Sequence, residues 1–497
     1  MGSLYHQVCI RLHSSRWLPG LALSGPILLF LSVYGPSAGH GFVRDDYAWM
    51  LHSQLNGWDD LLRVLGSDIG FYRPVVSLTF GFNGWFFGSN SLGYGLTNVL
   101  LALGCGWAIA SLARALGLPR GAAVLAGALW LVHPDFLPVS VLWISGRTAL
   151  LMILGATASA AALMRGRLWL SLAWLVVALF SKEEAVLVGF VLFAWLLILS
   201  SPPVRPLRWA LSAGAVEAMY FLARGLAGAT NPLNAPPFYR FTFDPATVAG
   251  NLAWYLLHAG GLALVVVVIA WLTLRITLAG RLPILRPSQL LLFSLIWILA
   301  GLGLTIWLPV RSHLYLALPA VGACLAAAAL CAEWWAAASP PRRPLAVGAA
   351  IALVVALVPA HLRGAREWTA RTDFAATVLG DLGALTAGLP DGSRVVLGDD
   401  RNDPRGNLAS VFGTMASEAS VVASGRPLLV WIEPPPPHAE VMGLRPPCQD
   451  CAAIRLNLVA GRLRPGPSSR SHFLEEQDLH GSRDIRLNSG KWIATGK

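Results

Sequence analysis

Charged residues are scarce in this chain of 497 residues: Asp, Glu, Lys and Arg make up 13% of it, while 55% is hydrophobic. A soluble domain usually carries about 25% charged residues, and the mean hydropathy here is +0.59. A soluble fold would leave too much apolar surface without cover. The composition therefore excludes an ordinary soluble globular protein.

Cysteine is also rare, with six residues scattered along the chain. Cys105, Cys324 and Cys331 lie in apolar runs, where a thiol is expected to act as a packing residue. Cys448 and Cys451 form an isolated CxxC in the polar tail, and no second ligand pair stands nearby. A local disulfide in an oxidising compartment is therefore favoured over zinc.

Long apolar runs are abundant, and each run of roughly 20 residues can cross a bilayer as a helix. Many of the 20 Trp residues lie near run ends, as expected for residues that anchor at the membrane interface. The runs fall near 18–37, 94–113, 121–142, 148–164, 168–180, 185–200, 207–227, 248–273, 287–308, 313–337 and 344–361. We predict an all-α polytopic membrane bundle of about eleven helices. The first run also resembles a signal peptide, but an uncleaved helix is favoured.

The net charge of +11 would point to nucleic acid in a soluble protein. Here the arginines sit in short loops between apolar runs, where they orient the chain, so no nucleic-acid partner is expected. The alternate loops that hold Arg and no acid contain Arg11, Arg16, Arg114, Arg120, Arg165, Arg167, Arg205, Arg208, Arg275, Arg281, Arg286, Arg342 and Arg343. This side is predicted to be cytoplasmic and to hold the N-terminus. Eleven spans then place the tail outside a bacterial inner or plasma membrane.

The composition shifts after the last apolar run. Possible strands near 393–397, 427–432 and 453–459 alternate with a helical stretch near 407–422. We predict two domains: a transmembrane domain over 1–361 and a small extracytoplasmic α/β domain over 362–497.

Acidic residues gather in the first outer loop. Asp45 and Asp46 follow the first apolar run directly, and adjacent acids at a membrane exit are costly unless they are solvated or used. A solvated loop start is one interpretation. A carboxylate that deprotonates an acceptor hydroxyl, or that holds a metal, is the other. Asp59 and Asp60 instead fit the N-terminus of an amphipathic helix lying in the interface.

Further polar clusters occur in the later outer loops. Lys182 and Arg147 suit a phosphate group, because the ammonium of lysine is a compact charge and the guanidinium of arginine donates two parallel hydrogen bonds. Glu183 or Glu184 could pair with these cations instead. In the seventh span Glu217, Tyr220 and Arg224 share one helix stripe. An acid near mid-membrane needs a partner, and Arg224 and Lys182 are the candidates. Arg311 and Arg224 are further candidate phosphate ligands. Beside Glu183, Glu184 and Glu217, the remaining pocket candidates are Tyr72, Arg73, His133, His313 and Tyr315.

The order of these motifs resembles the GT-C membrane glycosyltransferases, nearest the protein O-mannosyltransferase-like and RgtA/B/C/D-like branch. The motifs are the aspartate pair, Tyr-Arg-Pro, His-Pro, Gly-Arg, Ser-Lys-Glu and Arg-x-x-Leu-Tyr-Leu, over roughly residues 18–375. The resemblance implies a sugar donor on a polyprenyl phosphate, an acceptor hydroxyl reached from outside, and an inverting displacement. The tail departs from the tetratricopeptide type of this family, because no such repeats follow the membrane part.

The resemblance also implies roles for particular residues. Asp45 or Asp46 would be the base, and Lys182 and Arg311 would hold the donor phosphate. No cofactor is required; a divalent metal on the two aspartates is compatible with the pattern. The alternatives are a transporter or flippase of lipid-linked substrates, whose binding groups usually lie near the midplane in repeated halves, and a non-catalytic scaffold.

Overall fold

The computed structural model describes residues 18–66, 71–229, 239–275, 289–339, 342–400, 402–403, 406–436, 454–466, 484–488 and 491–495. The cysteine pair at 448 and 451 and the arginines at 11, 16, 281 and 286 lie outside the described residues. The chain forms two compact units. The first unit comprises Met1–Ala38, Tyr72–Val76 and Gly95–Arg366, and the second comprises Gly39–Phe71, Ser77–Tyr94 and Glu367–Lys497.

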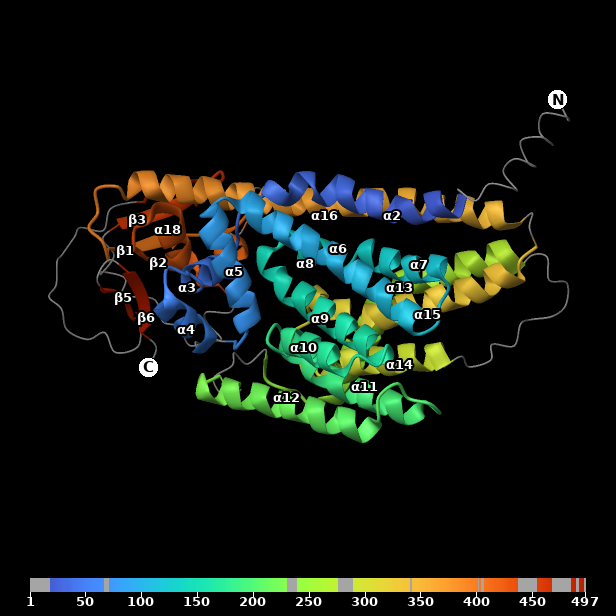
Figure 1. Cartoon of the computed structure of the whole chain (residues 1–497). Coiled ribbons are helices and arrows are strands. Elements are labelled where there is room, and N and C mark those ends of the chain that lie inside the picture. The colour runs from blue at the N-terminus through green and yellow to red at the C-terminus, as the bar shows by residue number, and fades with distance from the viewer. Residues whose placement is uncertain are drawn as a thin grey trace, which may run out of the picture. The chain divides into compact units, whose positions relative to one another are not determined.

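The first unit is a bundle of helices (Figure 1). Its helices, some of which extend past the unit's bounds, are α2 (Leu18–Tyr34), α6 (Ser91–Ala115), α7 (Arg120–Leu131), α8 (Leu137–Leu142), α9 (Arg147–Met164), α10 (Leu168–Leu179), α11 (Val186–Ile198), α12 (Pro206–Leu226), α13 (Pro245–Arg275), α14 (Gln289–Leu302), α15 (Ala317–Ala337) and α16 (Arg343–Leu385). The short 3-10 turns η2 (Ile144–Gly146), η3 (Glu183–Ala185), η6 (Thr305–Trp307) and η7 (His313–Leu316) connect them.

Six helical segments in the described part of the chain are long and apolar enough to cross a membrane: Ser91–Ala115, Ile144–Met164, Pro245–Leu274, Gln289–Trp307, His313–Ala337 and Arg343–Leu385. Two shorter apolar helices are Arg120–Leu131 and Leu168–Leu179. Each expected run contains helix, and the chain is a multi-pass membrane protein. The count of eleven spans stays a prediction.

Two of the expected boundaries are wrong. The run at 121–142 is not one helix, because α7 ends at Leu131 and α8 begins at Leu137. Pro134 lies in the break, and proline has no N–H to continue a helix. The last helix does not end near residue 361 but continues to Leu385 with Pro359 inside it.

Small residues let the helices of the first unit approach closely. A Cβ added to Gly127 on α7 would lie 2.2 Å from the carbonyl oxygen of Gly106 on α6. A Cβ on Gly155 of α9 would lie 2.7 Å from the backbone nitrogen of Ala178 on α10. Close backbone approach at glycine is typical of helix packing in membranes. Larger residues at 127 and 155 would force these helix pairs apart.

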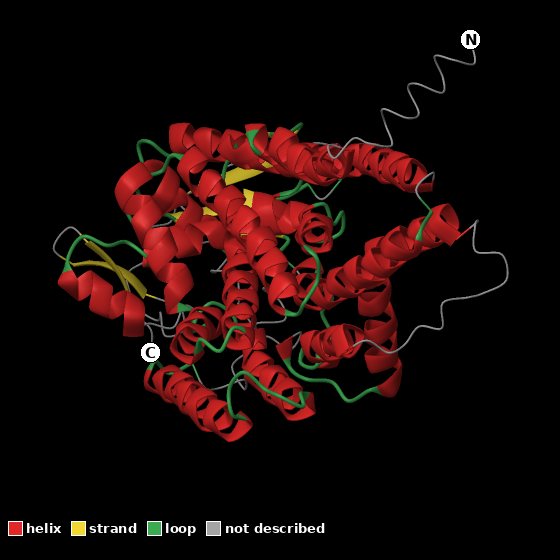
Figure 2. Cartoon of the chain, turned by 45° about the vertical axis from the view of Figure 1, so that its right-hand side comes forward, coloured by secondary structure: helices red, strands yellow, loops and turns green. Residues whose placement is uncertain are grey.

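The second unit combines helices with the strands of the chain (Figure 2). Its elements are α3 (Asp45–His52), α4 (Trp58–Gly66), most of α5 (Pro74–Phe87), the end of α16, β1 (Arg394–Gly398), α17 (Leu408–Phe412), α18 (Ala416–Ser424), β2 (Leu429–Glu433), β3 (Ile454–Val459), β4 (Arg462–Pro465), β5 (Asp484–Asn488) and β6 (Lys491–Thr495).

Four strands form a sheet in the order β2-β1-β3-β4. β1 pairs in parallel with β2 and with β3, and β4 pairs antiparallel with β3. β5 and β6 form a separate antiparallel pair. The strands β1, β2 and β3 lie within two residues of the segments that the sequence predicts to be strands.

Candidate functional site

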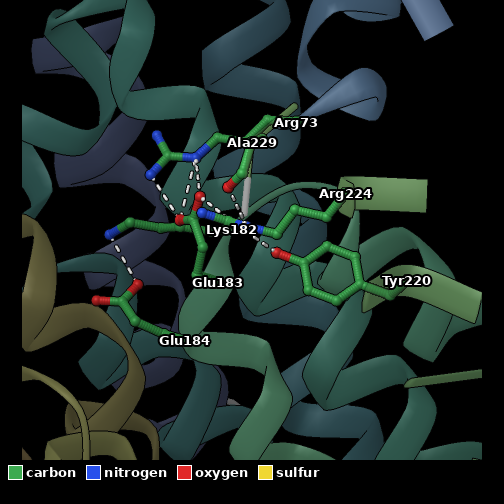
Figure 3. A network of polar contacts seen from close by, with 7 residues as sticks. All are labelled: Arg73, Lys182, Glu183, Glu184, Tyr220, Arg224 and Ala229. Atoms are coloured by element: carbon green, nitrogen blue, oxygen red, sulfur yellow. Dashed lines mark hydrogen bonds and ion pairs between the residues drawn. The ribbon is translucent and has the colours of Figure 1, made fainter. Parts of the chain in front are cut away.

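A cluster of charged side chains surrounds the turn between α10 and α11 in the first unit (Figure 3). Glu183 accepts hydrogen bonds from two arginines that come from distant parts of the sequence. Nη2 of Arg73 lies 2.7 Å from Oε2 of Glu183, and Nη1 of Arg224 lies 3.2 Å from Oε1. This single carboxylate therefore links the start of α5 to the end of α12.

Arg224 is held in place by two further bonds. Its Nε donates to the carbonyl oxygen of Ala229 at 2.9 Å, and its Nη1 also donates to the hydroxyl of Tyr220 at 3.0 Å. Tyr220 lies one turn earlier on α12 and is buried. The guanidinium is thus fixed by its own helix, by the turn after that helix and by Glu183.

Lys182 carries the most enclosed cation of the cluster, since only 5% of its side chain is exposed, against 13% for Arg73 and 21% for Arg224. Its Nζ lies 2.8 Å from Oε2 of Glu184 and 4.6 Å from the ring centroid of Tyr315. Burial lowers the pKa of Lys182, and the carboxylate of Glu184 opposes that shift. The ammonium group of Lys182 has three N–H donors, and the single contact with Glu184 does not use all of them.

Charge balance distinguishes this cluster from an ordinary structural ion pair. Burial would raise the pKa of Glu183, but the guanidinium groups of Arg73 and Arg224 lower it to about 2. Within the described part of the chain, the ion pairs of this cluster join three cations (Arg73, Lys182 and Arg224) to two carboxylates (Glu183 and Glu184). A cluster with more cations than carboxylates in a largely buried setting favours an anion.

Arg311 precedes η7. Its Nε donates to Oδ1 of Asn251 at 2.8 Å, and Nδ2 of Asn251 donates to the carbonyls of Ile306 and Leu308. The residue is exposed, and among the residues that the structure describes no carboxylate forms a salt bridge with it. The fixed Nε leaves the terminal amino groups available for an anion.

Imidazole and indole rings collect next to this arginine. Trp254 stacks on His258 with ring centroids 4.3 Å apart, and His313 meets Trp254 edge to face at 5.3 Å. His133 stacks on Phe136, and its Nε2 lies 3.4 Å from the carbonyl oxygen of Ala259. The cluster is therefore aromatic and weakly polar, unlike the charged cluster at Lys182.

Sequence reasoning missed Asn251, Trp254 and His258. These three residues are spaced i, i+3 and i+7 on the otherwise apolar helix α13. That spacing puts them on one face of a helix, so the polar stripe was present in the sequence. It was hidden by the high hydropathy of the surrounding run.

Two other candidate residues, Arg147 and Tyr72, are enclosed by neighbouring groups. Arg147 is fully buried, and its Nε donates to Oδ1 of Asn98, whose amide in turn binds carbonyls of the α8–η2 turn. Tyr72 is buried, with its ring edge to face with Phe180 at 5.9 Å. For Arg147 this enclosure favours a role in holding the turn.

Glu217 does not pair with the cations expected for it. Lys182 binds Glu184 and Arg224 binds Glu183, because both glutamates stand in the adjoining turn. Oε1 of Glu217 is instead buried without a hydrogen-bond partner. It lies against Gly189, where an added Cβ would come within 2.2 Å of it.

Asp45 and Asp46 lie in the second unit, in the first turn of α3. Asp45 is exposed, whereas Asp46 is fully buried. Oδ2 of Asp46 accepts a hydrogen bond from the backbone nitrogen of Val43 at 3.0 Å. Asp46 thus fixes the chain at the start of α3, whereas the residue Asp45 is exposed.

Metal-ligating residues do not assemble into a group of three or more within the described ranges. The acidic pair at 45 and 46 offers one exposed carboxylate and one that already accepts a backbone N–H.

No protein-family model and no curated protein sequence matches this chain. Among solved structures, the chain is similar to the Archaeoglobus fulgidus oligosaccharyltransferase in complex with zinc and sulfate, with 13% identity and a TM-score of 0.47. That match covers 83% of this chain and 62% of the other. The chain is also similar to apo ArnT from Cupriavidus metallidurans, with 15% identity and a TM-score of 0.44, over 82% of this chain and 86% of the other. The chain thus spans less than two thirds of the first of these proteins.

Proposed function

We propose that this chain is a GT-C-type membrane glycosyltransferase. It transfers a sugar from a polyprenyl-phosphate donor to an acceptor hydroxyl at the outer face of the membrane. The observation that carries the proposal is the partly neutralised cation cluster around Lys182, which is gathered from the ends of apolar helices. Such a cluster suits the phosphate of a lipid whose chain lies in the bilayer.

The phosphate is assigned to Lys182, with Arg311 as a second cation. Lys182 has donors that Glu184 does not satisfy, and the terminal amino groups of Arg311 project past the bond that fixes its Nε. Arg73 and Arg224 act through Glu183, because their guanidinium groups hold the turn that carries Lys182. Cations fixed before the reaction stabilise the charge that develops on the leaving phosphate.

The displacement proceeds with inversion at the anomeric carbon. The acceptor oxygen forms a bond to that carbon as the bond from carbon to phosphate oxygen breaks. The acceptor proton passes to the carboxylate of Asp45, and the polyprenyl phosphate leaves as an anion. A phosphate leaving group needs no general acid, unlike the glycosidic oxygen in glycoside hydrolysis, where two carboxyl groups share the work.

The deciding experiment is incubation of the purified protein with a panel of polyprenyl-phosphate sugars carrying mannose, glucose, galactose or arabinose. Hydrolysis of one donor, or transfer of its sugar, that is lost in Asp45→Asn would support the proposal. Transport of the intact donor across liposome membranes without cleavage would instead favour a flippase.

A further inference from the structure

The backbone of Arg44, directly before the aspartate pair, is in a conformation that a side chain disfavours. Its φ is 52° and its ψ is −126°, and only one other described non-glycine residue, Ala460, has a positive φ. Such a conformation costs of order 1–3 kcal/mol and persists only where the surroundings impose it. The strained residue is the N-cap of α3, so its backbone conformation sets the direction in which that helix begins.

Two hydrogen bonds from the far end of the sequence impose this conformation. The backbone nitrogen of Arg44 donates to the carbonyl oxygen of Val411 at 2.8 Å, and its Nε donates to the carbonyl oxygen of Ser410 at 2.7 Å. Both carbonyls belong to the last turn of α17, where helix carbonyls have no partner within the helix. Arg44 therefore supplies hydrogen-bond donors to the last carbonyls of α17, and α17 in turn fixes the backbone conformation of Arg44.

The start of α17 is held in turn by Asp399. This residue follows β1, and its own nitrogen donates to the carbonyl oxygen of Glu433 at the end of β2. Its Oδ1 and Oδ2 accept hydrogen bonds from the backbone nitrogens of Leu408 and Ala409 at 2.7 and 3.3 Å. A continuous path of hydrogen bonds thus runs from the sheet through Asp399 and α17 to Arg44.

The other side of the turn is fixed as well. Asp46 accepts from the nitrogen of Val43, and the hydroxyl of Tyr47 donates to the carbonyl oxygen of Phe42 at 2.7 Å. The ring of Tyr47 also packs on Phe412 of α17, with centroids 6.2 Å apart. The residues around Asp45 are therefore held both by their own turn and by α17.

We propose that Asp399 and α17 form a brace that holds Arg44 in its strained conformation and thereby sets the direction of the Asp45 carboxylate. Asp399 and Arg44 are positioning residues. The inference rests on the proposed function, since Asp45 is the base in that reaction. It gives the C-terminal residues a task in catalysis that is distinct from acceptor binding.

The test measures donor cleavage by wild type and variants with the polyprenyl-phosphate sugar that the panel identifies. Asp399→Ala is expected to lower kcat about 10- to 100-fold, because small misplacement of a reacting group has effects of this size. The KM for the donor should stay unchanged. Asp381→Ala is the control: Asp381 accepts from the backbone nitrogen of Leu463 and pairs with Arg462 in this unit, away from the path between Asp399 and Arg44, so its kcat should match wild type.

A double-mutant cycle separates positioning from general loss of stability. Arg44→Ala should lower kcat as Asp399→Ala does, and the combined variant should be no worse than either single one, because both break one path. If Asp399→Ala fails to fold, Asp399→Asn keeps one acceptor oxygen and should give a smaller fall in kcat. Unchanged kcat in the folded Asp399 variant, or additive losses, would overturn the brace.

The Asp45→Asn variant tests the proposed function independently of the Asp399 and Arg44 variants. Wild-type turnover that is abolished by Asp45→Asn supports the glycosyltransferase whatever the brace variants do. Wild-type turnover that persists in Asp45→Asn removes the base, and the brace with it.

Discussion

Asp45 and Asp46 are adjacent in the chain, but their carboxylates have different surroundings. Asp46 is enclosed and accepts the N–H of Val43, which is the arrangement of a residue that caps a helix start. Asp45 is exposed. A general base must reach the proton that it removes, so Asp45 is the better candidate of the pair.

Replacement of the two aspartates should therefore have different effects. Asp45→Asn is expected to lower transfer about 100- to 10,000-fold, the usual contribution of general base catalysis, while the protein still inserts and folds. Asp46→Ala should lower thermal stability, because losing a cap costs about 1 kcal/mol. Rates of donor cleavage and melting temperatures in detergent measure both effects. Normal transfer by Asp45→Asn would remove the assigned base.

Lys182 is expected to act on the donor. Lys182→Ala should raise the KM for the donor about 10- to 100-fold, since a hydrogen bond to a charged group is worth roughly 1.5–3 kcal/mol. The KM for the acceptor should change less.

The control is a double variant that replaces both Lys182 and its ion-pair partner Glu184. Lys182→Met/Glu184→Gln leaves no unpaired buried carboxylate, so it should be more stable than Lys182→Ala while its KM for the donor stays high. An unchanged donor affinity in both variants would reject the phosphate role.

At the scale of elements, the turn between α10 and α11 is held by ion pairs to its neighbours. Arg73 enters from the start of α5 and Arg224 from the end of α12. Both use the one carboxylate of Glu183, so loss of that charge would release two helix ends together.

The stability of this arrangement should depend on pH in the acidic range. The folded-state pKa of Glu183 is lowered to about 2, below its ordinary value of about 4.3. The stabilisation is therefore fully present above the ordinary value and is lost as pH falls from there towards 2.

Melting temperatures of wild type and Glu183→Gln, measured in detergent from pH 7 down to pH 3, test this dependence. Wild type should be more stable by several degrees at pH 7, and the difference should shrink below about pH 4.5. A difference that stays constant over this range would contradict the ion-pair assignment.

At the scale of the whole molecule, the arrangement of basic loops fixes a predicted orientation. The loop after α11 lies on the Arg-rich side, and the loop before α13 lies on the side with acids and histidines. The bias of Arg towards the cytoplasm is strong in short loops, so these two loops should lie on opposite sides of the membrane.

Thiol labelling tests the orientation in a background without native cysteines. Phe241→Cys should react with a membrane-impermeant maleimide in intact cells, and Ser201→Cys should react only in inverted vesicles. Labelling of both positions from the same side would overturn the proposed topology.

The sequence by itself determined the class of the molecule. Long apolar runs predict membrane helices because transfer into the bilayer depends on the composition of each segment. The strands β1, β2 and β3 were also predicted from the sequence, because strand and turn signals are local, whereas β4, β5 and β6 were not. The sequence also marked Lys182, Glu183 and Glu184 as chemically unusual.

Only the tertiary structure decided which partner each of these groups has. Glu183 pairs with Arg73, 110 positions away, Arg147 is enclosed beside Asn98, and Arg44 is held by carbonyls 366 and 367 positions later. These pairings depend on which helix ends and turns meet after packing. No local property of a segment contains that information, so the different surroundings of Asp45 and Asp46 became visible only in the folded chain.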